Sequence, residues 1–139
     1  MLHWQFITRF NHLNPPIDIK FGRKDCDEEQ YMNHCQQLKQ SGIRVEEYIK
    51  QNVLKGNNVV YTNNRFPYDL DSGIKHDLIW IQPGHHISIQ EVERIIRENN
   101  PNICLEKQCV YFKNVPKNQS IRAIEHYQVF ININTPHKL

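Results

Sequence analysis

Hydrophobic side chains recur with helical spacing in two stretches of the N-terminal half of the chain. The first stretch follows the acidic run 25–29, which complements the exposed N–H groups of a helix start, and predicts a helix over about residues 26–40. The second stretch extends from Val45 to Val53, and Gly56 follows where a left-handed C-terminal residue is favoured. We expect these two helices to form a helical hairpin.

After the second helix the spacing changes from helical to alternating, which is typical of β-strands. Strands are expected at 59–61, 76–81, 109–112 and 127–133, and a turn-rich loop of about ten residues separates the first two. A short helical turn is expected at 120–124. The pattern predicts an α+β fold in which a helical hairpin precedes a mostly antiparallel sheet of about four strands.

One further helix is predicted between the second and third strands. Its first residues, Ser88 to Glu91, have the spacing of a capping box, in which the side chains of a Ser and a Glu satisfy the first backbone N–H groups. Its apolar face consists of Ile89, Val92, Ile95 and Ile96. We expect this capped helix to cover one face of the sheet.

Strand alternation assigns side chains to two different sheet faces. In the last strand Val129 and Ile131 point to one face and His126 to the other, and in the second strand His76 lies opposite the apolar residues in the same way. If the capped helix covers the apolar face, His76 and His126 share the second, mixed face. The same reasoning places Tyr111 and Lys113 on that mixed face.

Length and composition indicate one soluble globular domain. The chain has 139 residues, of which 39% are hydrophobic and 23% charged, so one core is expected. Two consecutive prolines near residue 15 separate an N-terminal arm, residues 1–17, from a single α+β domain, residues 18–139. Frequent Ile and Asn with a single alanine resemble translation from an AT-rich genome.

Charge and cysteine usage exclude several classes of protein. A formal net charge of +2 is far from the basic excess of most nucleic-acid binders, so we do not expect a nucleic-acid partner. The sequence contains neither an apolar run of roughly 20 residues nor a secretion signal, which predicts a cytoplasmic protein without a membrane partner. The four cysteines are therefore expected to be reduced, and their spacing does not suit zinc. We expect no metal and no cofactor.

The aromatic arm residues have two candidate roles. Trp4, Phe6 and Phe10 either pack against the domain or contact a second copy of the chain, and the second case would make the protein a homo-oligomer. Base stacking is a weaker interpretation because no basic groove accompanies the aromatic side chains.

One set of polar residues stands out as a candidate site. Guanidinium and imidazole groups beside a hydroxyl group can bind a phosphate, because Arg offers a planar fork of donors and His carries a proton near neutral pH. We assign His76 and His126 as candidate acid–base groups and Arg122 as the anion clamp. The other candidate ligand-binding residues are Arg65, Asn114, Ser120 and Glu125.

Several dispersed motifs carry a resemblance to a known family. They are Val45-Glu46-Glu47-Tyr48-Ile49, Asn64-Arg65-Phe66-Pro67-Tyr68 with Gly73-Ile74-Lys75-His76 and Trp80, and Tyr111-Phe112-Lys113-Asn114 with Ser120-Ile121-Arg122-Ala123-Ile124-Glu125-His126. Together they span about residues 23–134 and resemble the N-acetylglucosamine-induced protein family, a mainly fungal domain of unknown function. The N-terminal arm lies outside this resemblance. The resemblance implies a shared fold and ligand but supplies no mechanism.

Two functional hypotheses remain open from the sequence. In the first, the chain binds a phosphate-bearing small molecule, such as a sugar phosphate or a nucleotide, in an Arg/His cleft and hydrolyses or transfers it, or only binds it. In the second, it is a non-catalytic protein-interaction module in which Arg122 pairs with Glu125 or Asp69 and the histidines anchor the long loop on the sheet. Whether the protein is an enzyme is left open.

Overall fold

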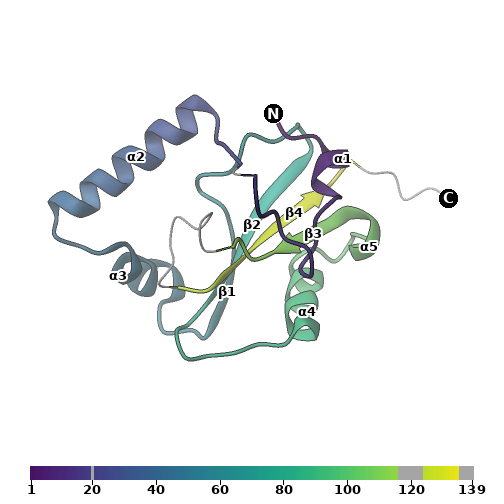
Figure 1. Cartoon of the computed structure of the whole chain (residues 1–139). Coiled ribbons are helices and arrows are strands. Elements are labelled where there is room, and N and C mark those ends of the chain that lie inside the picture. Colours follow the sequence, from purple (N-terminus) through teal and green to yellow (C-terminus); the bar gives the residue numbers. More distant parts are fainter. Residues whose placement is uncertain (20, 116–123, 135–139) are drawn as a thin grey trace.

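The two helices predicted in the N-terminal half are present in the computed structural model, which describes residues 1–19, 21–115 and 124–134. Helix α2 spans Asp25–Gln40 and has three acidic residues in its first turn. Helix α3 spans Val45–Ile49 and continues as the π-helical segment η1, Lys50–Leu54. In Figure 1, α2 and α3 lie together on one side of the sheet.

A four-stranded antiparallel sheet follows the helices. Its strands are β1 (Val59–Asn63), β2 (Ile74–Ile81), β3 (Cys109–Phe112) and β4 (His126–Asn132). The spatial order is β1-β2-β4-β3, and all three neighbouring pairs are antiparallel. The predicted α+β fold class is confirmed, and the long β1–β2 connection is the loop at residues 64–73.

Helix α4 covers the apolar face of the sheet, as predicted (Figure 1). It spans Ile89–Asn99, and the Ser88 hydroxyl accepts the Glu91 backbone N–H at 3.1 Å, so the N-terminal cap is confirmed. The core under this helix includes Ile79, Ile81, Val92, Ile96, Val129 and Ile131. Burial of this apolar surface holds α4 on the sheet.

The opposite face of the sheet is covered by two groups of elements. Helix α3 and η1 pack over Leu78 and Trp80. The N-terminal residues, including the short helix α1 (Trp4–Ile7), pack over Phe112 and Phe130, and the aromatic residues among them are Trp4, Phe6 and Phe10. Packing of the aromatic arm against the domain, one of its two expected roles, is thus observed.

Two short helices were not indicated by the sequence pattern, and one predicted element cannot be compared. Helices α1 and α5 (Leu105–Gln108) have four residues each, which is too short for a recognisable period. The helical turn expected at 120–124 lies largely outside the described residues.

The assignment of Tyr111 and Lys113 to the mixed face is wrong. Tyr111 pairs with Val129 across the β3–β4 ladder, so both side chains point to the face that α4 covers. The Lys113 ammonium lies 5.5 Å from the centre of the Tyr127 ring, on this same face. The mixed face instead receives Val110 and Phe112.

A polar network is buried beneath α4. Asp77 has no exposed surface and accepts hydrogen bonds from the Tyr61 hydroxyl and from Asn63 Nδ2, the latter at 2.8 Å. The Lys75 ammonium lies 3.1 Å from the same carboxylate and donates to Asn100 at 2.7 Å. Burial, followed by the bond to Asp77, raises the pKa of Tyr61 far above its usual range. The network joins β1, β2 and the end of α4.

The described residues bear on three general expectations, which concern membrane crossing, the cysteines and metal binding. None of the helices in the described ranges combines the length and apolar composition that a membrane crossing requires. Cys26, Cys35, Cys104 and Cys109 are free thiols. Within the same ranges, no group of three or more His, Cys, Asp and Glu residues has an arrangement that could hold a metal ion.

Candidate functional site

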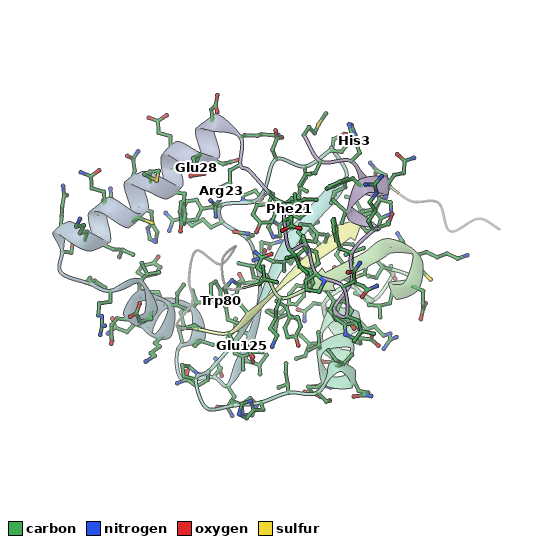
Figure 2. All side chains as sticks on the ribbon, viewed as in Figure 1. His3, Phe21, Arg23, Glu28, Trp80 and Glu125 are labelled. Carbon is green, nitrogen blue, oxygen red and sulfur yellow. The ribbon has the colours of Figure 1, made fainter. Side chains whose placement is uncertain are left out.

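A cleft of about 240 Å³ lies between the mixed face of the sheet, α2, α3 and the β1–β2 loop. Residues of all these elements line it, because the loop folds back over β2 and α2 closes the side. Figure 2 shows Trp80 on the sheet between the helices and the centre of the molecule. The mixed face that the sequence predicts thus does form one wall of a cleft.

Aromatic rings form much of the lining. They include Tyr31 and His34 from α2, Tyr48 from α3, Phe66 and Tyr68 from the loop, and Trp80 and His126 from the sheet. Several of these rings contact one another: the Trp80 and His126 ring centres are 4.5 Å apart, and those of His34 and Tyr48 are 4.8 Å apart. Such a wall offers flat surfaces to an aromatic ligand.

Two arginines give the cleft a positive character. Arg23 donates to the Phe66 carbonyl at 2.9 Å and pairs with Glu28 at 3.3 Å, and Figure 2 shows this pair beside the start of α2. Arg65 is exposed at the cleft and lies 3.4 Å from the Tyr48 hydroxyl oxygen. Among the described residues Arg65 forms no ion pair, and the lining contains neither Asp nor Glu. An anion entering the cleft therefore meets a guanidinium without a competing carboxylate.

The predicted acid–base group His76 lies beneath the cleft and does not line it. Its Nδ1 accepts the Tyr68 backbone N–H at 3.2 Å, so the proton of the neutral ring is on Nε2, which donates to Gln128 Oε1 at 2.5 Å. Burial lowers the pKa of His76 to about 3. With both nitrogens occupied and the ring neutral, His76 anchors the loop on the sheet.

His126, the second predicted acid–base group, does line the cleft. Its Nδ1 donates to the Ile124 carbonyl at 2.9 Å, which leaves Nε2 as the unprotonated nitrogen of the neutral ring. Burial lowers the pKa of His126. The register places His76 opposite Phe130 and His126 opposite Trp80, so both histidines lie on one sheet face, as predicted.

Asn114 and Glu125 do not line this cleft. The Asn114 amide donates to the Tyr68 hydroxyl at 2.9 Å, and Glu125 pairs with Lys113 at 2.9 Å. Both residues line a second, more open cavity of about 660 Å³, which His126 also touches. The candidate residues therefore divide between two cavities, and His126 borders both.

The remaining candidates lie outside the described residues, and several cleft residues, including Arg23 and Gln128, were missed. Ser120 and Arg122 lie outside the described ranges, so their assignment as ligand-binding residues stays a prediction from the sequence. Gln128 is 5% exposed, lines the cleft and bonds to His76. The alternation of β4 already placed it on the same face as His126, which was the available signal.

Fold and site together define a class: an α+β domain whose antiparallel sheet carries an aromatic cleft with two arginines. A family model described as "Protein of unknown function (DUF3605)" matches residues 5–132. The chain therefore belongs to this family. The match includes most of the N-terminal arm, which the motifs quoted from the sequence leave out.

One solved structure supports the fold. A structure titled "Crystal Structure of HTC1" superposes with a TM-score of 0.54 at 18% sequence identity, over 81% of this chain and 76% of that chain. At this identity the likeness shows a shared fold. A search of curated proteins finds no match.

Proposed function

We propose that the protein binds a phosphate-bearing small molecule, such as a sugar phosphate or a nucleotide, in the aromatic cleft. The observation that carries this proposal is the Arg65 guanidinium, which lies at a lining without Asp or Glu and forms no ion pair with the described residues. A guanidinium offers a phosphate two parallel hydrogen bonds, each strengthened by the opposite charges. The Arg122 clamp remains part of the proposal on sequence grounds.

A chemical step, if the ligand undergoes one, would use His126. Its unprotonated Nε2 has no hydrogen-bond partner among the described residues, and the ring touches both cavities. A neutral imidazole with one fixed N–H group suits a general base. His76 is the weaker candidate because both of its nitrogens are engaged with the loop and Gln128.

A second candidate function is supported by a different observation. His76, Asn114 and Glu125 all find partners within the chain, as an architectural network requires. This favours a protein-interaction module in which the network only holds the loop. The two candidate functions predict different results: a ligand-binding protein is stabilised by a small phosphate compound, and an interaction module is not.

The finer family identification is also a proposal. The motifs quoted from the sequence resemble the N-acetylglucosamine-induced protein family and imply a ligand shared with it, and the description of the matched family names no ligand. A cytoplasmic location belongs to the same proposal and rests on the sequence alone.

Arg65→Ala is expected to weaken phosphate-ligand binding by about 10-fold to 100-fold, because a hydrogen bond to a charged group contributes about 1.5–3 kcal/mol. Arg65→Lys, which keeps the charge without the fork, should lose less. Thermal-shift titrations with inorganic phosphate, ribose 5-phosphate, glucosamine 6-phosphate and AMP measure this, since a ligand of the native state raises the melting temperature.

The matched control is Arg97→Ala, which removes an exposed arginine from α4 on the opposite face of the sheet. It should bind as the wild type does. Because Arg65 is exposed, its variants should melt near the wild-type temperature without ligand. If no probe raises the melting temperature, or if Arg65→Ala responds like the wild type, the interaction-module hypothesis is favoured.

A further inference from the structure

The side chain of Gln128 presents a hydrogen-bond donor to the cleft floor. The residue is 5% exposed and lines the cleft, and its Oε1 accepts the Nε2–H group of His76. The amide NH₂ group therefore points away from His76, and it has no hydrogen-bond partner among the described residues. This nitrogen is open to the cleft, because among the described residues every buried side-chain nitrogen or oxygen has a hydrogen-bond partner, and an acceptor of a bound ligand can take its hydrogen bond.

The orientation of this amide is fixed by a chain of hydrogen bonds. The Tyr68 backbone N–H group occupies His76 Nδ1, which forces the imidazole proton onto Nε2. A protonated Nε2 donates its hydrogen bond, and only the oxygen of the Gln128 amide can accept it, so the amide cannot rotate by half a turn without losing that bond. His76 is thus a positioning residue for Gln128.

We infer that the ligand of the cleft is a nucleotide and that the Gln128 amide recognises its base, an inference that rests on the proposed function. Arg65 is exposed at the cleft, whereas Gln128 and Trp80 are buried at its floor. A ligand that satisfies both ends has an anionic group outside and a flat group with hydrogen-bond acceptors inside. A nucleotide has this polarity, whereas a sugar phosphate has no aromatic base to place against the indole and the amide.

The neighbours of Gln128 support the inner part of this assignment. Trp80 lies opposite His126 in the β2–β4 ladder and Leu78 lies opposite Gln128, so these side chains adjoin on one sheet face. Ring stacking adds to hydrogen bonding in base recognition and tolerates different bases, because every base has a flat aromatic face. The amide NH₂ group would donate to a carbonyl oxygen or a ring nitrogen of the base.

Isothermal titration of the full chain with AMP, GMP, CMP, UMP, ribose 5-phosphate and inorganic phosphate tests the inference. At least one nucleotide is expected to bind tenfold or more tightly than ribose 5-phosphate. This comparison needs no variant, so it remains informative if changes at Gln128 impair folding. Equal affinity of all four nucleotides and ribose 5-phosphate overturns the inference.

Two variants then test the residue itself. Gln128→Glu keeps an acceptor for His76 and removes the NH₂ group, and Gln128→Leu removes both without adding charge. In each, the ratio of nucleotide to ribose 5-phosphate affinity should fall by about 2-fold to 12-fold, the range of one neutral hydrogen bond. The ratio cancels the repulsion that the new carboxylate exerts on both phosphates. Gln90→Glu and Gln90→Leu, exposed on α4, are the matched controls.

The possible failures are distinguishable. If ribose 5-phosphate binds in an Arg65-dependent manner and the bases add nothing, the nucleotide inference is wrong while the proposed function stands. If none of the six probes binds and glucosamine 6-phosphate also leaves the melting temperature unchanged, both are wrong. An unchanged affinity ratio in folded Gln128 variants, with tight nucleotide binding, overturns the role of Gln128.

Discussion

Asp77→Ala is expected to lower the free energy of unfolding by about 2–3 kcal/mol. The Asp77 carboxylate is fully buried and accepts from Tyr61 and Asn63 while pairing with Lys75. Its removal leaves the partly buried Tyr61 hydroxyl without this acceptor, which costs about 1–3 kcal/mol, whereas the exposed Asn63 amide can bond to water instead. Lys75 adds less than a fully buried partner would, because its side chain is 35% exposed and can be rehydrated. Urea unfolding measures the change.

Asp77→Asn separates charge from shape. The amide keeps an acceptor for Tyr61, so it should destabilise the protein less than alanine does. Glu98→Ala is the control, because Glu98 is an exposed ion-pair partner of Arg94 on α4 and its loss should fall within the scatter of the measurement. Equal small effects for Asp77→Ala and Glu98→Ala would contradict a structural role for the buried network.

Stability is expected to fall as the pH is lowered below 6.5, by about 2 kcal/mol at pH 5. Burial, partly opposed by the bond to Gln128, lowers the His76 pKa from 6.5 to about 3. Between these values the unfolded chain binds one more proton at this site than the folded chain does. Each unit by which the pH falls between these values therefore lowers the free energy of unfolding by about 1.4 kcal/mol. Above pH 6.5 this histidine contributes little further change. Urea unfolding at several pH values measures the slope.

The variant His76→Gln should flatten this pH dependence, whatever its stability at pH 7. His126 contributes in the same direction, because burial also lowers its pKa, so some slope remains. Arg23 and His126 are the charged or titratable groups that further disfavour protonation of His76. A slope that is the same in His76→Gln and the wild type would mean that His76 is not held neutral in the folded protein.

Regular hydrophobic patterns made most of the fold predictable. The capping box at Ser88 and the helical spacing behind it identify α4 and the face it covers, because apolar burial decides which side of an element turns inward. The alternation in β2 and β4 likewise places His76 and His126 on one face. Short helices such as α1 and α5 have no such pattern and were missed.

The strand β3 shows where pattern reasoning fails. Cys109, Val110, Tyr111 and Phe112 are all apolar or aromatic, so their sequence does not reveal which pair faces α4. Only the register, with Tyr111 opposite Val129, settles the question. A one-residue difference in register exchanges the two faces, which is why Tyr111 and Lys113 were assigned to the wrong one.

The cleft was predictable in its location but not in its chemistry. The alternation of side chains identified the sheet face on which the cleft lies. The turn-rich loop between the first two strands contains Arg65, which places this residue near that face. The role of His76 depends on the Tyr68 backbone N–H group, which reaches it only because the loop folds back over β2. Asn114 and Glu125 line a different cavity from Arg65, and this separation also depends on tertiary packing. Neither follows from local sequence.

The central claim is that the aromatic cleft binds a phosphate-bearing small molecule. The two indole N–H groups provide a direct test, because Trp80 lines the cleft and Trp4 packs in the N-terminal arm outside it. In ¹H–¹⁵N spectra titrated with phosphate, ribose 5-phosphate and AMP, at least one probe should shift the Trp80 indole signal saturably while the Trp4 signal stays in place. Absence of a saturable Trp80 shift with all three probes, or equal shifts at both indoles, would contradict the claim.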